Sequence, residues 1–555
     1  MYFTRVLIFS PHLITIGKEN VTSVLALRSQ CVQHMEVSPF LALLLIGLLS
    51  IVILFTKKPS PSCGDGRRLP PSPPGLPLLG HLPLLGSLPH RKLRSLAEEH
   101  GPVMLLRLGR VPTVVASSAA AAQEAMKTRD LAFASRPRAR MAERLLYGRD
   151  MVFAPYGEHW RQARRVSVLH LLSPRRVASF RRVREQEAAA LLGRVRRACL
   201  AGGVNLSDLL ISYANAVISR AAFGDGWDHD DGLGGGGGAG GKLRKVFADF
   251  EELLGTGTVG EFVPWLAWVD TLRGLDAKAT RTFHALDGLL ERVIADHRQR
   301  RRGSRRVGDG DDDHRDFVDV LLDVNETEEE AGGIRFDTVA IKAIILDMFA
   351  AATDTTYTTL EWAMAELINH PEEMRTLQEE IRAAAGGGNH AVTEDHLSEL
   401  RRLKAVIKET LRLHAPVPLL VPRETVEDTE LLGHRVPART RVVVNAWAIG
   451  RDPAAWERAE EFVPERFAGD DPAVDQYALG QDFRFVPFGA GRRGCPGVGF
   501  AVPSIELALA SLLYHFDWEL PAGGPSTVDM DELYGLSVRL KATLYLVAKP
   551  WCPTG

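Results

Sequence analysis

This chain of 555 residues contains few cysteines and carries almost no net charge. The five cysteines are widely spaced and include no C-x-x-C pair, which argues against a disulfide-stapled secreted fold and favours a reducing compartment. A formal net charge of −2 argues against a general affinity for nucleic acid. The chain also lacks an internal repeat. Its hydrophobic content of 45% is that of ordinary globular material with a large core.

One long apolar run lies near the N-terminus, from Val37 to Phe55. Its length of about 19 residues is enough for a helix to cross a hydrocarbon layer. Lys57 and Lys58 follow directly, so the positive-inside rule places the rest of the chain in the cytosol. We predict a transmembrane anchor over residues 36–56, preceded by an N-terminal extension, residues 1–35. A cleaved signal peptide is the alternative, but it requires positive charge ahead of a shorter apolar core.

After the anchor, residues 57–80 are first basic and then rich in proline. Prolines favour an extended, stiff backbone, so we predict a hinge that leads to one globular domain over residues 81–555. A ligand for a small adaptor domain is the alternative reading of such a stretch. Within the globular part, the glycine-rich segment Asp228–Gly241 and the charged segment Arg298–Asp313 are typical of solvated loops.

The globular part is mostly helical in its hydrophobic period. Four runs instead have the short, β-branched character of strands, and they are Val103–Leu108, Thr113–Ala116, Val442–Asn445 and Thr543–Val547. The pattern predicts a mainly α fold, formally α+β, with small β-sheets.

Ten residues near the C-terminus carry the strongest chemical signal. From Phe488 to Gly497 they place Cys495 in a glycine-rich turn, beside Arg493 and just ahead of an apolar, helix-like run. A thiolate is a strong, soft ligand for iron, and glycines let backbone N–H groups approach the sulfur. A helix starting near Gly497 adds its positive end, and Arg493 can pair with a carboxylate such as a porphyrin propionate. For a lone cysteine, a buried structural thiol is the plainer alternative.

The complete pattern F-x-x-G-x-R-x-C-x-G resembles the haem-binding signature of the cytochrome P450 superfamily. The matching residues are Phe488, Gly491, Arg493, Cys495 and Gly497. The resemblance covers about residues 70–550 and looks specifically like the plant A-type group. It implies the cytochrome P450 fold, a large helical domain with small β-sheets, and a haem b cofactor (iron protoporphyrin IX). Cys495 would be the axial thiolate, with Phe488, Arg493 and Gly497 in contact with the cofactor.

A polar patch interrupts an apolar helical stretch at Asp354 and Thr355. An enzyme that splits dioxygen must carry protons into an apolar cavity, and an acid beside a hydroxyl is a minimal relay. Taken alone, the patch fits a core helix whose threonines bond back onto their own carbonyls. Together with Cys495 it resembles the oxygen-activating segment A/G-G-x-D-T-T/S of the family, which makes Asp354 and Thr355 the expected catalytic residues.

Two positions depart from what the family pattern or a regular helix favours. Ala352 stands where glycine is usual in the oxygen-activating segment, and its methyl group is expected to crowd the oxygen site. Pro503 lies inside the helix predicted after Cys495, where it should kink or loosen the backbone.

Three further charged residues belong to patterns that resemble family elements. Glu409 and Arg412 form an E-x-x-R pair, one above the other on a helix, and Arg466 follows in a P-E-R-F motif. Most such pairs are salt bridges on the surface that contribute little to stability. By resemblance these three residues form a buried network that fixes the cysteine loop against the haem.

Trp160 and Arg164 lie one helical turn apart, so both can point at one target. A basic surface helix is the plainer reading of this W-x-x-x-R segment. The resemblance instead implies that Trp160, Arg164 and, from the Pro422-Arg423-Glu424 segment, Arg423 contact the haem propionates.

The implied activity is monooxygenation of an apolar or amphipathic small molecule of specialised metabolism, with one oxygen atom taken from O2. Because the chain contains no flavin or nicotinamide fingerprint, the electrons must come from a separate reductase. By resemblance that partner is the membrane-bound NADPH–cytochrome P450 reductase, which takes them from NADPH. By resemblance the enzyme is a single-pass protein of the endoplasmic reticulum membrane, with its catalytic domain in the cytosol. Partners are then the reductase, a small hydrophobic substrate and membrane lipid, with no nucleic acid.

Substrate contacts are expected, again by resemblance, in the variable segments that flank the haem. These are Met141–Phe153, the helix positions Met348 and Ala352, Val417–Val421, and Gly535–Ser537. Two rival functions remain at this point. A haem-thiolate dehydratase or isomerase would need no reductase, and a haem-binding sensor or electron carrier would have no use for a proton relay.

Overall fold

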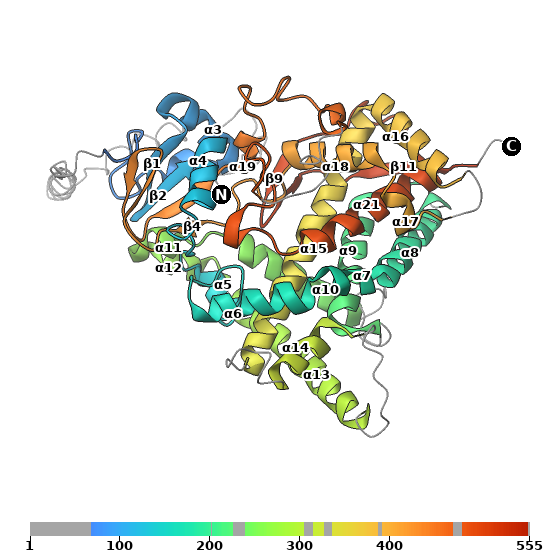
Figure 1. Ribbon diagram of the computed structural model, residues 1–555, viewed down its shortest axis with the longest axis horizontal. Helices are drawn as coiled ribbons and strands as arrows, with labels where there is room; N and C mark the ends of the chain where they lie inside the picture. Colours follow the sequence, from blue (N-terminus) through green and yellow to red (C-terminus); the bar gives the residue numbers. More distant parts are fainter. Residues whose placement is uncertain are drawn as a thin grey trace, which may run out of the picture.

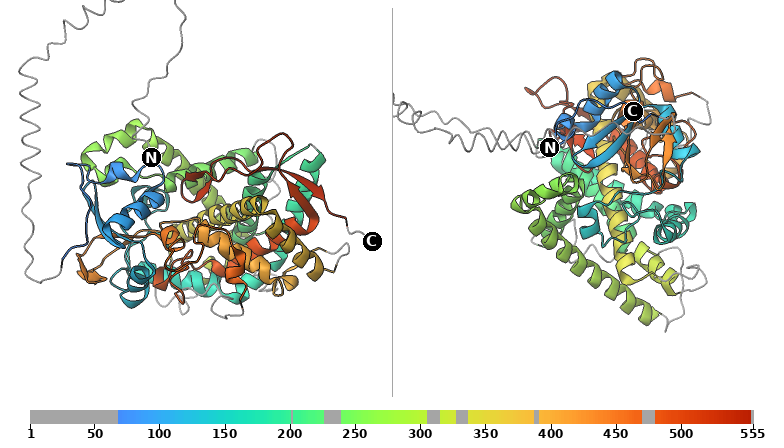
Figure 2. Two further views of the ribbon diagram at one scale, coloured as in Figure 1. Left: turned by 90° about the horizontal axis from the view of Figure 1, so that it is seen from above. Right: turned by 90° about the vertical axis from the view of Figure 1, so that its left-hand side faces the viewer.

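The computed structural model describes residues 68–200, 202–225, 239–304, 315–326, 336–386, 391–469 and 480–552. The predicted N-terminal extension, the anchor, the basic part of the hinge and most of the glycine-rich segment lie outside these residues. The described chain has a strand-rich end and a larger helical part, which Figure 1 shows from the side and Figure 2 from two further directions. This is the mainly helical architecture with small sheets that the sequence predicts.

Helices make up most of the described chain. The longer ones are amphipathic or buried segments with few internal breakers. Their bounds are α3 (Pro89–His100), α4 (Ala119–Gln123), α5 (Arg140–Leu145), α6 (Glu158–Val166), α7 (Pro174–Ser179), α8 (Arg181–Leu200), α9 (Leu206–Phe223), α10 (Ala239–Gly255), α11 (Val259–Phe262), α12 (Trp268–Leu272), α13 (Leu275–Ser304), α14 (Phe317–Glu326), α15 (Thr338–Asn369), α16 (Pro371–Ala384), α17 (Glu394–Leu397), α18 (Arg401–Leu413), α19 (Ala446–Ile449) and α21 (Val498–His515).

The strands form four small sheets among the described residues. The largest has the order β1-β2-β7-β4, in which β2 and β7 are parallel and the other neighbours antiparallel. The strands are β1 (Val103–Leu108), β2 (Val111–Ala116), β3 (Val204–Asn205), β4 (Arg423–Glu424), β5 (Thr429–Leu431), β6 (His434–Val436), β7 (Arg441–Val444), β8 (Phe516–Glu519), β9 (Glu532–Tyr534), β10 (Val538–Leu540) and β11 (Tyr545–Pro550). All four runs predicted as strands are confirmed, with shifts of up to three residues at their ends.

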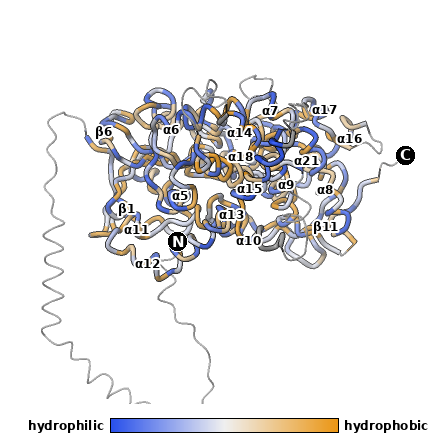
Figure 3. The backbone as a smooth tube through the Cα atoms, turned by 90° about the horizontal axis from the view of Figure 1, so that it is seen from below, coloured by the Kyte–Doolittle hydropathy of each residue, from blue (hydrophilic) through white to orange (hydrophobic). Residues whose placement is uncertain are grey.

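The 32-residue helix α15 runs through the middle of the molecule and organises the core. It packs against α9, α18 and α21 and appears in yellow in Figure 1. The region around α15 and α18 is strongly hydrophobic, whereas the surrounding helices alternate hydrophobic and hydrophilic residues (Figure 3). Because α15 is buried on nearly all sides, any polar side chain that it carries faces either a partner or a cavity.

One expectation, that the charged segment is a loop throughout, was wrong. The basic run that begins at Arg298 is not a loop, because helix α13 continues to Ser304. The proline-rich segment is tied to the globular body: the Leu105 N–H donates to the Pro71 carbonyl, and the His81 ring bonds the Pro73 carbonyl at 2.8 Å.

The helix predicted after the cysteine is confirmed as α21, with Gly497 at its N-cap. It runs without interruption through Pro503, so the proline does not end it. Val498–His515 is long and apolar enough to cross a membrane, but 72% of it is buried inside the molecule. It is therefore a core helix, and it carries the cysteine loop at its N-terminal end.

Candidate functional site

The cysteine loop is closed by its own backbone. The Cys495 N–H donates to the Phe488 carbonyl at 2.9 Å, and the Gly494 N–H donates to the Gly491 carbonyl. Gly491 has φ +68°, and a Cβ at this position would lie 2.2 Å from the Met126 carbonyl oxygen. The loop therefore needs glycine there, both for its backbone conformation and for its close approach to the Met126 segment.

The Cys495 thiol lies at the N-terminal end of α21. Burial raises its pKa, while the N–H groups of Gly497 and Val498 and the charge of Arg164 lower it. The predicted arrangement of backbone donors and a positive helix end around the sulfur is thus present. The aromatic Phe488 is half-buried and packs against the main hydrophobic core.

Four buried or partly buried arginines surround the loop. Arg493 donates to the carbonyls of Ala134, Met151 and Ala154. The other three bond further carbonyls: Arg164 reaches Gly494 at 2.7 Å, Arg423 reaches Ala490 at 2.8 Å, and Arg136 reaches Val152 at 3.1 Å. The sequence-predicted residues Arg164, Arg423 and Arg493 are therefore brought together. Trp160 joins them, with its indole N–H on the Met151 carbonyl and its ring under Arg493.

These guanidinium groups outnumber their counter-charges. Burial and the charges of its neighbours Arg423 and Arg164 lower the pKa of Arg493 to about 9, and burial also lowers the pKa of Arg136. Asp130 and Asp150 are the carboxylates that oppose this charge. Four arginines against two aspartates leave an excess of positive charge, which an anionic group with two carboxylates would balance. Beside a cysteine with iron-ligand chemistry, this cluster fits the propionates of a haem.

Asp354 and Thr355 lie together on α15 at the wall of a cavity of about 240 Å³. Burial raises the pKa of Asp354, and its Oδ2 has no hydrogen-bond partner among the described residues. The Thr355 hydroxyl donates to the Ala351 carbonyl at 2.7 Å. Both the back-bonded threonine and the cavity position are thus present, and the hydroxyl oxygen can still accept a hydrogen bond.

The cavity is mostly apolar. Its lining comprises Leu146, Val152, Phe153, Leu254, Gly255, Asp347, Ala350, Ala351, Asp354, Thr355, the six residues 417–422, Tyr534, Gly535, Leu536 and Val538. The predicted segments before Phe153, at Val417–Val421 and at Gly535–Leu536 contribute to it. Met348, Ala352 and Ser537 are not among the lining residues. On α15 the cavity is lined by Asp347, Ala350 and Ala351 in addition to the expected Asp354 and Thr355, whereas Met348 and Ala352 pack in the main hydrophobic core.

The predicted E-x-x-R network is present and buried. Arg412 and Glu409 are paired at 2.7 Å with both side chains fully buried, and Arg466 adds a contact to Glu409 at 3.0 Å. Arg412 also donates to the carbonyls of Gly450, Ala459 and Glu461. The pair of Glu409 with Arg466 therefore joins α18 to the segment that precedes the cysteine loop.

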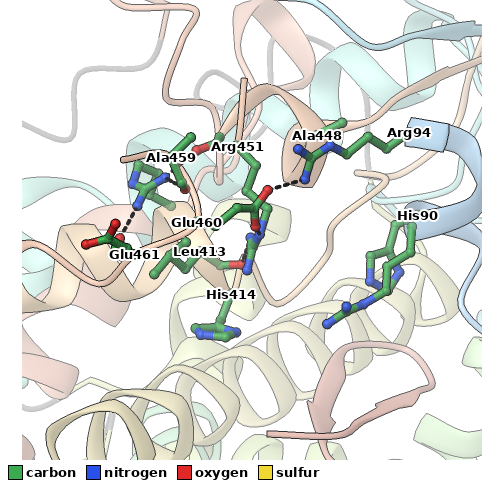
Figure 4. A network of polar contacts seen from close by, with 12 residues as sticks. His90, Arg94, Leu413, His414, Ala448, Arg451, Ala459, Glu460 and Glu461 are labelled. Carbon is green, nitrogen blue, oxygen red and sulfur yellow. Dashed lines mark hydrogen bonds and ion pairs between the residues drawn. The ribbon is translucent and has the colours of Figure 1, made fainter. Parts of the chain in front are cut away.

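A third arginine, Arg451, extends this network. Arg451 donates to the Leu413 carbonyl at the end of α18 and to Glu460 at 3.1 Å, while Glu460 also binds Arg94 (Figure 4). Arg451 lies 4.3 Å from the ring of Trp447 as well. These contacts hold α3, α18 and the segment around α19 together.

Sequence reasoning missed two residues of the site. Arg136 belongs to a run of alternating arginines whose spacing does not single it out. Asp347 lies seven residues before Asp354, and this spacing places both on one helix face. That periodicity was a usable signal for Asp347.

Comparisons with known proteins agree with this geometry. The Cytochrome P450 family profile matches residues 70–546. Cytochrome P450 736A117 of Prunus mume is 45% identical over 521 residues, covering 93% of this chain and 97% of its own length. Norfluorocurarine oxidase of a Strychnos species is 44% identical over 508 residues, covering 90% and 96%.

A solved structure has the same fold. A zebrafish cytochrome P450, determined with progesterone, superimposes with a TM-score of 0.69 and 25% sequence identity, covering 83% of this chain and 99% of its own. The sequence signature, the fold and the relatives agree over most of the length. The chain belongs to the cytochrome P450 family, the haem-thiolate monooxygenases, and to its plant A-type group.

Proposed function

We propose that this protein is an anchored plant monooxygenase that inserts one atom of O2 into a neutral, apolar or amphipathic molecule of specialised metabolism. The observation that carries the proposal is the cysteine loop itself, with its thiol at a helix N-terminus and an excess of buried arginine charge beside it. When bound, haem b supplies a thiolate-ligated iron that activates dioxygen.

The residues have separable tasks in this proposal. Cys495 is the iron ligand, and Phe488 and Gly497 shape its surroundings. Arg164, Arg423 and Arg493 bind the two propionates, together with Arg136, and Trp160 positions Arg493. Each of these groups acts by binding or orienting the cofactor.

Asp354 and Thr355 have a different task, since they face the apolar cavity. Burial raises the pKa of Asp354, which favours the protonated form relative to an exposed carboxyl, and the adjacent Thr355 hydroxyl can accept a proton and pass it on. Most of the lining around them is apolar, so these two groups are proposed to deliver protons to the reacting centre.

Electrons are proposed to come from a membrane-bound NADPH–cytochrome P450 reductase. The predicted anchor over residues 36–56 would hold the protein in the endoplasmic reticulum membrane with the body in the cytosol. The exposed Arg492, next to the cysteine loop, is the kind of residue that an acidic partner would contact.

The deciding experiment is a metabolite screen of membranes that contain this protein with the reductase, with and without NADPH. Products that carry one oxygen atom from labelled O2 and require both reductase and NADPH support the proposal. Products formed equally well without NADPH would instead identify a dehydratase or isomerase. The Cys495→Ala variant serves as the control, since it should abolish the product and the thiolate-type spectrum of the reduced carbon monoxide complex.

A further inference from the structure

Asp130 does more than balance charge beside the cysteine loop. It lies in the segment between α4 and α5, and its side chain is 12% exposed. Its two oxygens have different partners: Oδ1 accepts a hydrogen bond from Nη1 of the buried Arg423 at 3.2 Å, and Oδ2 accepts one from Nε of the exposed Arg492 at 2.7 Å. One carboxylate therefore joins a buried arginine of the site to an arginine at the surface.

The same carboxylate holds the backbone of the loop. Oδ2 also accepts the Arg492 N–H at 3.1 Å, while Arg423 donates from Nη2 to the Ala490 carbonyl at 2.8 Å. These two peptide groups lie on either side of Gly491, where a Cβ would come within 2.7 Å of Oδ1 of Asp130. Asp130 and Arg423 together thus close a ring of hydrogen bonds around this turn, just ahead of the cysteine.

Arg423 differs from the other three arginines beside the loop in having a carboxylate partner. Among the described residues it is the only one of the four with a carboxylate oxygen within ion-pair distance, and that oxygen belongs to Asp130. Burial lowers the pKa of Arg423, and the charge of Asp130 opposes this change. A guanidinium carries its five N–H donors in one plane, so a bond to Asp130 fixes the plane in which the remaining donors can meet a propionate.

We propose that Asp130 is a positioning residue for the haem, which orients Arg423 toward a propionate and lowers the reduction potential of the iron through its negative charge. The inference rests on the proposed function. A negative charge near a buried cofactor favours the oxidised state, which carries one more positive charge. Removing the charge should therefore raise the potential. A loosened site that admits water should lower it, because solvent also stabilises the more highly charged state.

The first measurement is the rate at which the purified, haem-loaded protein loses haem to an excess of apomyoglobin. We expect Asp130→Ala to lose haem about tenfold faster, because the charge-assisted bond that orients Arg423 is removed. Asp130→Asn should lose haem more slowly than Asp130→Ala, since its amide oxygen can still accept from Arg423. Equal rates in the natural protein and Asp130→Ala, or in the two variants, overturn the proposal.

Double variants test whether Asp130 acts through Arg423. In the Arg423→Gln background, adding Asp130→Ala should speed haem loss by less than about twofold, because no guanidinium is left to orient. In the Arg164→Gln background Asp130→Ala should keep its full effect, since Arg164 bonds the Gly494 carbonyl and not Asp130. An effect of Asp130→Ala that is equal in the two backgrounds contradicts the proposed route through Arg423.

The midpoint potential of the haem separates charge from packing, and it decides the question if Asp130→Ala does not fold. Asp130→Asn should raise the potential, so that the ratio of reduced to oxidised haem at the natural midpoint rises about threefold. Glu427→Gln is the matched control and should leave the potential unchanged, because this exposed carboxylate lines the same surface pocket as Asp130.

A lower or unchanged potential in Asp130→Asn, or an equal rise in Glu427→Gln, overturns the proposal. The proposed function fails separately, if the reduced carbon monoxide complex of the natural protein has the spectrum of a nitrogen-ligated iron.

Discussion

The guanidinium of Arg493 lies over the indole ring of Trp160, 3.9 Å from the ring centroid. Both side chains donate to the Met151 carbonyl, the indole at 3.0 Å and the guanidinium at 3.4 Å. The tryptophan of the W-x-x-x-R pattern therefore acts on the cysteine loop through an arginine of that loop. Two motifs that lie far apart in the sequence form a single stacked pair.

This pair makes Arg493 a sensitive position for haem retention. We expect Arg493→Gln to lower haem affinity at least tenfold, because a charge-assisted bond to a propionate and a cation–π contact are both lost. The measurement is the haem content per polypeptide after gel filtration. Arg492→Gln is the matched control, since this neighbour is exposed and pairs with Asp130. Equal haem loss in both variants would contradict the assignment.

Gly491 is predicted to tolerate no side chain. Gly491→Ala adds a methyl group that would clash with the Met126 carbonyl and forces alanine into a left-handed conformation. We expect about 2–5 kcal/mol of destabilisation, seen as a lower thermal midpoint. Gly499 lies in α21, and a Cβ there would meet nothing within 4 Å. Because alanine favours the helix more than glycine does, Gly499→Ala should raise the free energy of unfolding by up to about 1 kcal/mol.

The buried pair of Arg412 and Glu409 should be among the most costly interactions to break. Arg412→Met leaves an uncompensated buried carboxylate with only Arg466 beside it, and we expect a loss of about 3–5 kcal/mol. Unfolding by urea measures it. Arg375→Met, which removes an exposed pair on α16, should cost less than about 1 kcal/mol. Similar losses in both variants would show that the buried network contributes no more to stability than the exposed pair does.

The ionisation of Glu366 should make the stability of the fold depend on pH. Burial opposes its ionisation, but hydrogen bonds from His370 and His414 outweigh burial and lower its pKa to about 2. A depressed carboxyl pKa stabilises the fold above the unfolded value of about 4.5, and this stability is lost as pH falls from 4.5 toward 2. At neutral pH the contribution is about 3 kcal/mol.

The test compares Glu366→Gln with the natural protein by thermal unfolding at several pH values. The difference in unfolding free energy should be largest at neutral pH and shrink steadily below pH 4.5. The variant Glu372→Gln, at an exposed glutamate of the next helix, should follow the natural protein. A difference that is independent of pH would refute the assignment.

Thr355 and Thr353 offer a test of the proton relay within one helix. We expect Thr355→Val to lower product formed per NADPH consumed about tenfold or more and to release hydrogen peroxide, because proton delivery fails. Thr353→Val should retain tight coupling, since the Thr353 hydroxyl faces away to Asn215. Product and peroxide yields with a turned-over substrate decide between them. Equal uncoupling in both variants would mean that helix packing, not the hydroxyl, is responsible.

The sequence was most informative where local chemistry constrains the backbone. The strands, the start of α21 and the conformation of the cysteine loop all follow from glycine, β-branched residues and their spacing. The untested roles of Trp160, Arg164 and Arg423 came from resemblance, and the structure brings these three side chains together around Arg493.

The sequence could not determine how a buried helix is rotated about its axis, or which distant segments of the chain contact one another. Helix α15 is apolar on almost every face, so its periodicity does not tell which residues face a cavity, and Met348 was expected where Asp347 lies. The partnership of Asp347 with Asp150, like the position of Arg136, depends on how distant segments meet.

The contacts of the cysteine loop have a consequence for biosynthesis. Gly491 fits against Met126, Arg493 against Ala134 and Gly494 against Arg164, so the thiol is positioned by segments that leave the ribosome long before it. A domain generally folds as a unit, and here early segments also depend on late ones, as in the pairing of β2 with β7. Insertion of the pigment must therefore wait until translation is nearly finished.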